Sequence, residues 1–407
     1  MTTQSVILVL NSGSSSVKYK LLQLKDEAIL LEGSIKGIGE SSAKHHVCVD
    51  KRFSDIVKQS ESTVAIKNHQ AAFHVIADDM QCFFNGASGI QLDVIGHRVV
   101  HGGARFFAPV ELNKDVLTTI ESYQHLAPQH LPGNIAGIKT CQELFSQVRQ
   151  FAVFDTDFHQ TIPEHVYRYA VPDDWYQNHD VRRYGFHGLS HQYVAQQAAV
   201  YLDKPLNELN LITLHLGNGA SACAIKNGQS FDTSMGFTPL QGLMMGNRSG
   251  DLDAAVPLYI QEQTGISAEQ LEHQLNFESG LVAITGTHNM AEIQHRAEQG
   301  DKEASLAIQM YVHQLRRYIG AYMISLGRVD AIIFTGGIGE NAAMIRALAC
   351  DELGRYGVVI NAENNQKLKE TVSAVHHLRS DVPVLVIKTD EEKQIARNIA
   401  IQLNLNK

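Results

Sequence analysis

The sequence predicts an α/β protein. Short apolar runs, each about the length of one strand, alternate along the chain with stretches of helical periodicity. A pattern of strand, small-residue turn and second strand occurs near the N-terminus and again in the middle of the chain, which points to a repeated unit. The 407 residues are enough for two or three domains with substantial cores.

The predicted strands are uninterrupted apolar runs followed by turn-forming residues, so most of them are expected to be buried on both faces. They comprise residues 6–10, 94–95 with 99–100, 151–154, 211–216, 331–334 and 384–387.

Helices are predicted between these strands. Over 303–327, apolar residues recur at spacings of three and four and form one helical face that ends at Gly327. A second helix is expected over 342–353, after a glycine-rich turn. The last helix is predicted to begin after Thr389, because Thr389, Asp390, Glu391 and Glu392 fit the pattern of a capping box.

The repeated pattern predicts two β-hairpins. Residues 6–10 lead into the turn 11–16 and an alternating strand over 17–21, and residues 211–216 lead into the turn 217–221 and a strand over 222–225. Two interpretations stay open. Either the hairpins are unrelated, or the chain contains a duplicated domain in which two tight turns direct backbone N–H groups at phosphate in one cleft.

Composition and charge exclude several classes of protein. The net charge of −9 does not indicate the basic surface that nucleic-acid binding needs, and the longest apolar runs are far shorter than a membrane span. The N-terminal residues lack the basic region of a signal peptide. The five cysteines are scattered without a Cys-x-x-Cys pair, as is typical of idle thiols in a reducing cytoplasm.

The polar motifs indicate a cleft that handles anions. The first hairpin carries Asn11, the three consecutive serines 14–16 and Lys18, but the chain has neither a Walker phosphate loop nor a dinucleotide fingerprint. Glycine-flanked cations and histidines occur in 96–103, 182–188 and 245–251. Any one of these side chains is more often structural than functional, so the prediction depends on their combination with the hairpins and the glycine-rich turn 335–341.

Taken in order, these segments resemble the acetate kinase family. The resemblance covers essentially the whole chain and is carried by residues 11–18, 96–103, 154–160, 184–191, 215–219, 232–251, 335–341 and 389–392. It implies a duplicated actin-like (ribonuclease H-like) two-domain kinase fold with a cleft between the lobes. The expected lobes are 1–154 with 394–407, and 155–393. It also implies a homodimer that transfers phosphoryl from ATP to acetate, giving ADP and acetyl phosphate, with Mg²⁺ or, in its place, Mn²⁺.

The resemblance also implies roles for individual residues. Catalysis is assigned to Asp155, His187 and Arg248, and the metal site to Asn11 and Glu391. The substrate carboxylate is assigned to Arg98, and the acyl pocket to Val100, Gln129, Phe186 and Pro239. The nucleotide and its phosphates are assigned to Ser14, Ser16, Lys18, His215, Leu216, Gly217, Asn218, Gly219, Asn289, Gly337, Ile338, Gly339, Glu340 and Asn341.

Physical chemistry agrees with most of these roles. Phosphoryl transfer is catalysed mainly by positioning and by stabilising charge, which suits Arg248 and His187. Acetate is already ionised at pH 7, so we expect Asp155 to orient Mg²⁺ through water rather than to act as a base. Glu391 also has a purely structural interpretation, as a carboxylate near a helix N-terminus.

The chain departs from the family at three functional segments, and one of these departures is Asn247, where the family usually has threonine before the arginine. Gln129 stands where the family usually has leucine, so it either gives the acyl pocket a polar edge or is a neutral substitution. Residues 287–292 read Thr-His-Asn-Met-Ala-Glu where the family commonly has Ser-Ser-Asp-Met-Arg-Asp. Three alternatives therefore remain beside an acetate kinase. They are a kinase for another short carboxylate such as propionate, a kinase that uses another phosphoryl donor, and an ATP-driven binding module of the actin and chaperone type.

Overall fold

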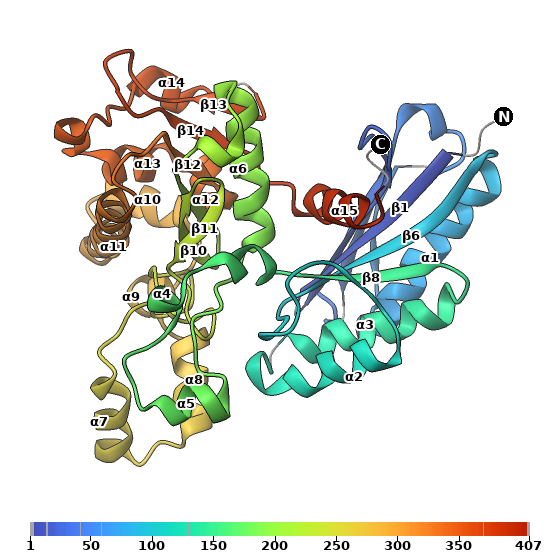
Figure 1. Cartoon of the computed structure of the whole chain (residues 1–407), viewed down its shortest axis with the longest axis horizontal. Coiled ribbons are helices and arrows are strands. Elements are labelled where there is room, and N and C mark those ends of the chain that lie inside the picture. Colours follow the sequence, from blue (N-terminus) through green and yellow to red (C-terminus); the bar gives the residue numbers. More distant parts are fainter. Residues whose placement is uncertain are drawn as a thin grey trace. The chain divides into compact units, whose positions relative to one another are not determined.

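The chain forms two compact units. The computed structural model describes residues 4–13, 15–40, 42–57, 59–128, 130–368 and 370–404 (Figure 1). The first unit comprises residues 1–157 and 390–407, and the second comprises 158–389. The expected lobe boundaries were placed after residues 154 and 393, so Asp155 and Glu391 belong to the first unit here rather than to the second.

The first unit is built on one mixed sheet. Within the described ranges its strand order is β5-β4-β3-β2-β1-β6-β8-β7, in which β1, β6 and β8 run parallel. The strands are β1 (Gln4–Ser12), β2 (Ser16–Gln23), β3 (Ile29–Lys36), β4 (Ala43–Val49), β5 (Ser60–Val64), β6 (Ile90–Val99), β7 (Val110–Glu111) and β8 (Arg149–Phe154). The antiparallel pairing of β1 with β2 confirms the first predicted hairpin.

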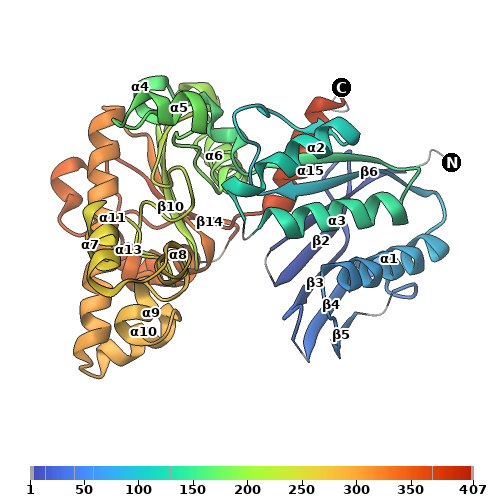
Figure 2. The same ribbon diagram turned by 90° about the horizontal axis from the view of Figure 1, so that it is seen from below.

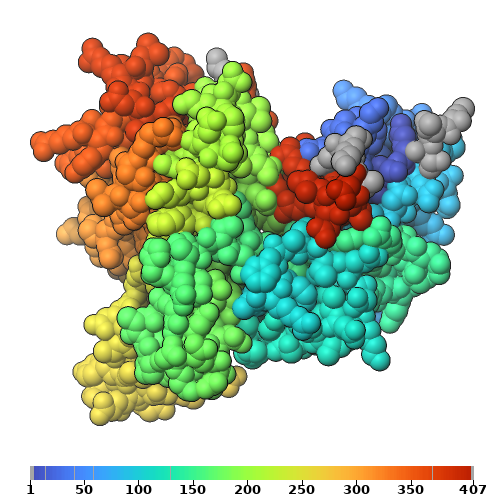
Figure 3. All heavy atoms as spheres, in the orientation of Figure 1, coloured from blue at the N-terminus to red at the C-terminus, as the bar shows by residue number. Residues whose placement is uncertain are grey.

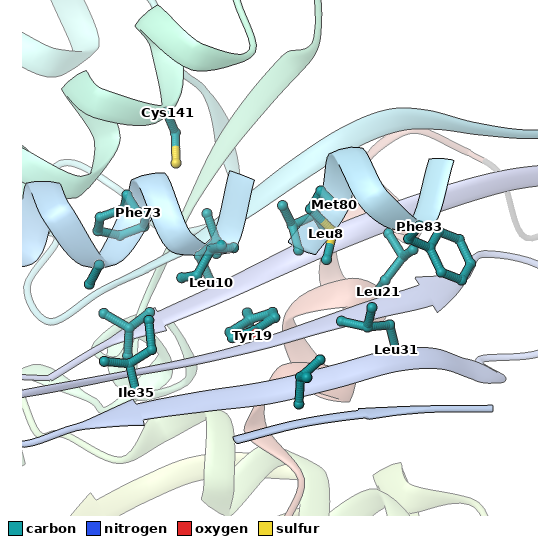
Figure 4. Close-up of a cluster of buried hydrophobic side chains, with 14 of the residues drawn as sticks. Leu8, Leu10, Tyr19, Leu21, Leu31, Ile35, Phe73, Met80, Phe83 and Cys141 are labelled. Carbon is teal, nitrogen blue, oxygen red and sulfur yellow. The ribbon is translucent and has the colours of Figure 1, made fainter. Parts of the chain in front are cut away.

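Helices cover both faces of this sheet. The helices are α1 (His69–Gly86), α2 (Lys114–Ser122), α3 (Leu131–Leu144) and α15 (Glu391–Gln402), and α1 and α3 pack on one face (Figure 2). Alternate residues of the strands, such as Leu8, Leu10 and Tyr19, point at α1 and form the core with Phe73 and Met80 (Figure 4).

The C-terminal helix α15 packs against the N-terminal strands on the opposite face. It contacts β1 and β6, and the space-filling view shows its red side chains beside the blue N-terminal segment (Figure 3). Gly96 in β6 makes this approach possible, because a methyl group there would lie 2.6 Å from Ile399.

The second unit repeats the same sheet topology. Its described strands are β9 (Leu211–Leu216), β10 (Ala220–Lys226), β11 (Gln229–Thr233), β12 (Ala331–Thr335), β13 (Val372–Ala374) and β14 (Val384–Ile387), in the order β11-β10-β9-β12-β14-β13. The segment β11-β10-β9-β12-β14 matches β3-β2-β1-β6-β8, with two antiparallel pairings followed by two parallel ones. The duplication of the domain is therefore confirmed, and the interpretation as two unrelated hairpins is wrong.

The second unit contains helices as well. They are α4 (Glu164–Tyr167), α5 (Asp173–His179), α6 (Gly188–Leu202), α7 (Ala255–Thr264), α8 (Ala268–Phe277), α9 (Gly280–Thr285), α10 (Met290–Glu298), α11 (Lys302–Leu326), α12 (Gly336–Asn341), α13 (Ala343–Cys350) and α14 (Ala362–Gln366). The helix α6 packs on β9, β12 and β14, and α11 packs on β10. Among the described residues, no helix combines the length and the apolar character needed to cross a membrane.

Three helix predictions can be compared with these bounds. The helix predicted over 303–327 is confirmed as α11, which Gly327 ends. The helix predicted over 342–353 is α13, which is shorter than expected and ends at Cys350, and the glycine-rich segment before it forms a separate helix, α12, rather than a turn. Thr389 is not the N-cap of the last helix. Asp390 is the N-cap, and its carboxylate accepts a hydrogen bond from the backbone of Lys393 at 3.0 Å.

Candidate active site

The carboxyl ends of three parallel strands in the first unit bring together three predicted residues. Asn11 lies near the end of β1, Arg98 near the end of the adjacent β6, and Asp155 directly after β8. Arg98 Nε donates to Asp155 Oδ1 at 2.8 Å and Nη2 donates to the other carboxylate oxygen, while Nη1 donates to Asn11 Oδ1 at 3.1 Å. This edge of an open α/β sheet is where such folds bind ligands.

The start of α15 adds two carboxylates to this cluster. Asn11 Nδ2 donates to Glu391 Oε2 at 3.2 Å and to Glu392 Oε1 at 2.8 Å. Lys20 Nζ lies 2.8 Å from Asp390 Oδ2 and 3.5 Å from Glu392 Oε2. Asn11 therefore joins the strand ends to the helix N-terminus. We call the set of Asn11, Arg98, Asp155 and Glu391 the carboxylate cluster.

Burial and the neighbouring charges shift the pKa values of Arg98 and Asp155 in opposite directions. Burial alone would lower the pKa of Arg98, but Asp155 and Glu391 raise it above the ordinary arginine value. Burial raises the pKa of Asp155, and Arg98 offsets part of that increase. The pair is therefore held together in a site that excludes most water.

The donors around Asn11 fit a magnesium ion that is shared with a substrate. Among the described residues, no group of three or more His, Cys, Asp or Glu side chains forms a dedicated metal cage. Mg²⁺ usually keeps several waters and takes one or two carboxylates together with substrate phosphates. The Asn11 amide and the Glu391 carboxylate offer such oxygen ligands. Around them, the four carboxylates of Asp155, Asp390, Glu391 and Glu392 exceed the two cations of Arg98 and Lys20.

The first hairpin positions Lys18 and Ser16 at the same end of the sheet. Lys18 lies opposite Asn11 in the register of β1 and β2, so both side chains leave the same face. Lys18 is exposed, and the backbone N–H of Gly13 donates to the carbonyl of Ser16 at 2.8 Å to close the turn. Ser14 and Gln129 lie outside the described residues. Val100 is buried, and its N–H donates to Asn134 Oδ1 at 3.0 Å.

In the second unit, His187 is held in an uncommon backbone conformation. It precedes α6 with φ 57°, a left-handed value that costs a residue other than glycine about 1 kcal/mol. Its Nδ1 lies 2.9 Å from Ser221 Oγ, and its ring stacks on His215 with centroids 4.3 Å apart. His215 Nδ1 in turn lies 2.7 Å from Ser190 Oγ. Neighbouring groups therefore fix both rings.

Arg248 lies beside His187 at the second hairpin. A methyl group on Gly219 would lie 3.4 Å from His187 Nε2 and 3.6 Å from Arg248 Nη1, so both side chains reach this glycine of the hairpin turn. Arg248 Nη1 also donates to the carbonyl of Pro239 at 3.4 Å, and burial lowers the pKa of Arg248. We call His187, Gly219 and Arg248 the cationic loop. Phe186, the residue before His187, is buried.

Three segments far apart in the sequence line one cavity of about 280 Å³ in the second unit. The predicted residues among its lining are Gly217, Asn218, Asn289, Gly337, Ile338 and Asn341. Gly336, at φ +78°, allows the close approach of α12 to the hairpin, because a methyl group there would lie 2.8 Å from the carbonyl oxygen of Leu216. A concave site of this size with a few polar groups is typical of small-molecule binding.

Some predicted nucleotide residues do not line this cavity. Leu216 is fully buried in the sheet, and Gly339 packs near Phe334 and Leu216. The carboxylate of Glu340 accepts from the backbone N–H of Gly336 at 3.0 Å and of Thr389 at 3.4 Å. Leu216, Gly339 and Glu340 therefore support the glycine-rich segment 336–341 without lining the cavity.

Sequence reasoning missed residues that support the site. Ser221 holds His187, and Glu392 holds Asn11. Arg346, although fully buried, donates to the carbonyls of Gly339 at 2.8 Å and Glu340 at 3.0 Å. Ser221 and Glu392 lie within predicted motifs, the turn 217–221 and the segment 389–392, but no role in the site was assigned to either, and Arg346 belongs to no short motif. The one signal in the sequence that could have singled out Arg346 is its position as a charged residue on the buried face of a predicted helix.

Comparison with known proteins agrees with this geometry. Residues 6–397 match the sequence profile of the acetokinase family. This chain belongs to the acetokinase family. It is 43% identical over 406 residues to the acetate kinase of Carboxydothermus hydrogenoformans, a match that covers 98% of this chain and 100% of that protein.

Solved structures of two kinases resemble this chain over nearly its whole length. The crystal structure of Porphyromonas gingivalis acetate kinase aligns with a TM-score of 0.88 at 38% identity and covers 98% of this chain and 100% of its own. A propionate kinase from Francisella tularensis aligns with a TM-score of 0.89 at 39% identity, with 97% and 98% coverage. The duplicated α/β fold expected from the sequence is therefore confirmed.

Proposed function

We propose that this chain catalyses reversible, Mg²⁺-dependent phosphoryl transfer from ATP to acetate, giving ADP and acetyl phosphate. Membership of the acetokinase family makes it a phosphotransferase that uses a carboxyl group as acceptor, which sets aside the non-enzymatic binding module. The observation that carries the proposal is the carboxylate cluster. Hydrogen bonds join residues to which the resemblance assigned the substrate carboxylate (Arg98), catalysis (Asp155) and the metal (Asn11 and Glu391).

Acetate is assigned to the first unit, where Arg98 would hold its carboxylate. Among the hydrogen bonds of the described residues, Asp155 uses two of the five N–H groups of Arg98 and Asn11 uses a third. Two N–H groups are left, which is enough for a bidentate carboxylate. Asp155 and Asn11 thereby fix the orientation of Arg98 before the substrate arrives.

The nucleotide is assigned to the cavity of the second unit, and its transferring phosphoryl group to the cationic loop. Arg248 and His187 would stabilise the charge that spreads over the equatorial oxygens during transfer. Acetate is ionised at neutral pH, so no residue has to remove a proton from it. Mg²⁺, when bound, neutralises phosphate charge, and Asn11, Glu391 and, through water, Asp155 would hold it. Mn²⁺ is expected to substitute.

Propionate is the second candidate acceptor. It is favoured by the structural similarity to a propionate kinase. One further buried CH₂ is worth about 0.8 kcal/mol when the pocket has room for it. The proposal also includes a homodimer in the cytoplasm, as the sequence led us to expect, and sedimentation of the purified chain would test the dimer.

A hydroxamate assay tests this function directly. Purified protein is incubated with Mg²⁺, a phosphoryl donor and one acid from a panel that includes acetate, propionate, butyrate and a hydroxy acid, and acyl phosphate is trapped with hydroxylamine. The donors compared are ATP, GTP and pyrophosphate. We expect the fastest formation of acyl phosphate with acetate and ATP. Formation only with another acid or another donor would replace the substrate assignment, and no acyl phosphate from any pair would overturn the proposed function.

A further inference from the structure

The hydroxyl of Ser221 connects His187 to a second, buried histidine. Ser221 Oγ lies 2.9 Å from His187 Nδ1 and 2.8 Å from His191 Nε2. Ser221 is fully buried on β10, two residues after Gly219 of the cationic loop. A serine hydroxyl has one proton, so it donates to one of these two nitrogens and accepts from the other.

The connection continues from His191 into the core of the second unit. His191 Nδ1 lies 2.7 Å from Thr213 Oγ1, and both residues are fully buried. Burial first, and then the neighbouring His159 and His215, lower the pKa of His191 well below the ordinary histidine value. His191 is therefore neutral, with one nitrogen that donates and one that accepts.

Two directions of hydrogen bonding are possible along this connection. In the first, Thr213 donates to His191 Nδ1, His191 Nε2–H donates to Ser221, and Ser221 donates to His187 Nδ1. In the second, every bond is reversed.

The direction of these bonds decides what His187 can do at the loop. In the first direction Nδ1 accepts, so a neutral His187 carries its proton on Nε2, the atom that lies beside Gly219. Arg248, at the same glycine, disfavours a second positive charge on the ring. In the reversed direction, neutral His187 would present a lone pair to an anionic ligand and would repel it.

We propose that Ser221, itself oriented by His191 and Thr213, is a positioning residue that holds His187 as the neutral Nε2–H tautomer, a hydrogen-bond donor toward the transferring phosphoryl group. The proposal deepens the proposed function and rests on it for the identity of the phosphoryl group. It assigns no proton transfer, because the connection only fixes where each proton stays.

The tautomer of His187 can be measured without activity. Protein labelled with ¹⁵N-histidine gives a long-range ¹H–¹⁵N correlation spectrum in which neutral Nε2–H, neutral Nδ1–H and imidazolium rings have different patterns. The His187 signals are those missing from the spectrum of His187→Gln. The expected pattern at pH 7.5 is neutral Nε2–H. A neutral Nδ1–H ring or an imidazolium in the wild-type protein would overturn the proposal.

Variants separate positioning from a merely structural role. Ser221→Ala is expected to mix the His187 tautomers and to lower kcat about tenfold, while KM for acetate and ATP changes less than about twofold. Ser221→Thr keeps the hydroxyl and should restore both the tautomer and kcat to within about threefold. Ser230→Ala is the matched control, because Ser230 is also a buried strand serine bonded to a buried histidine, His159, at 2.8 Å.

The outcomes distinguish this proposal from the proposed function. Wild-type protein without phosphoryl transfer to any carboxylate would refute the function, whatever the tautomer. Wild-type protein that is active, with a Ser221→Ala variant of unchanged tautomer and kcat, would refute the positioning role alone. Equal losses in Ser221→Ala and Ser230→Ala would also refute it, because the effect would then be general to the core.

Discussion

Replacing Arg346 with methionine should weaken both the fold and the nucleotide cavity. Arg346 is fully buried on α13, and burial lowers its pKa to about 10. Its guanidinium donates to Gly339 and Glu340 in α12 and, in α14, to Asn365 Oδ1 at 2.7 Å and to the Asn365 carbonyl at 2.6 Å. Arg346→Met introduces an apolar side chain of similar length and leaves these four oxygens without the guanidinium donor.

The expected loss is about 3–5 kcal/mol of unfolding free energy. Each hydrogen bond from a charged donor contributes roughly 1.5–3 kcal/mol, and the recovered cost of burying the charge offsets part of that sum. Because Gly337, Ile338 and Asn341 of α12 line the cavity, KM for ATP should rise about tenfold while KM for acetate changes less than about twofold.

Urea unfolding followed by circular dichroism, together with initial rates at varied ATP, measures both effects. Arg316→Met is the matched control, because the ion pair of Arg316 with Glu352 at 3.0 Å is largely exposed and should contribute less than about 1 kcal/mol. Equal stability of Arg346→Met and wild type, with an unchanged KM for ATP, would refute the role of Arg346 in holding the turn.

Four further predictions concern substrate, nucleotide and pH. Arg248→Ala should lower kcat on the order of 10³-fold, whereas Arg98→Ala should mainly raise KM for acetate. In steady-state rates, near wild-type turnover of Arg248→Ala would refute the role of Arg248, and an unchanged KM for acetate in Arg98→Ala would refute that of Arg98. ATP and GTP should differ less than about tenfold in kcat/KM, because the family's acidic and arginine contacts are missing from 287–292, and a hundredfold preference would show that other residues select the base. Gln129→Leu should lower KM for acetate about three- to tenfold if glutamine gives the pocket a polar edge, and an unchanged KM for acetate and propionate would make it a neutral substitution. Burial lowers the pKa of His97 to about 4, below its unfolded value of 6.5, so the stability that neutral His97 contributes is complete above pH 6.5 and is lost as pH falls toward 4, by about 1.4 kcal/mol per pH unit. Urea unfolding midpoints at pH 7 and pH 5 should show a smaller pH dependence in His97→Gln than in the wild type. An equal pH dependence in both proteins would contradict the prediction.

Local sequence patterns predicted the fold because its strands and hairpins are encoded in short segments. Residues 384–387 coincide with β14, and the repeated hairpin pattern correctly indicated the duplication of the two sheets. The start of the helix after β12 was misjudged, because glycines usually indicate a turn. In α12, the Glu340 side chain accepts from the N–H of Gly336 and supports a helical turn there.

The candidate site was predictable only where it follows a motif. Asn11, Arg98 and Glu391 were singled out together by resemblance, and the structure brings them into one hydrogen-bonded cluster. Their roles remain predictions. The roles of Ser221 and Arg346 could not be found in this way, because what a single serine or arginine does depends on hydrogen-bond partners elsewhere in the sequence.

The reverse reaction, followed by ³¹P NMR, tests the central claim most directly. Purified protein, ADP, Mg²⁺ and acetyl phosphate are mixed, with EDTA in place of Mg²⁺ and the variant Arg248→Ala as controls. The account predicts that the acetyl phosphate signal falls while the γ-phosphate signal of ATP rises in equal amount, and that both controls suppress this exchange. Acetyl phosphate that is stable, or that yields only inorganic phosphate with the wild-type protein, would contradict it.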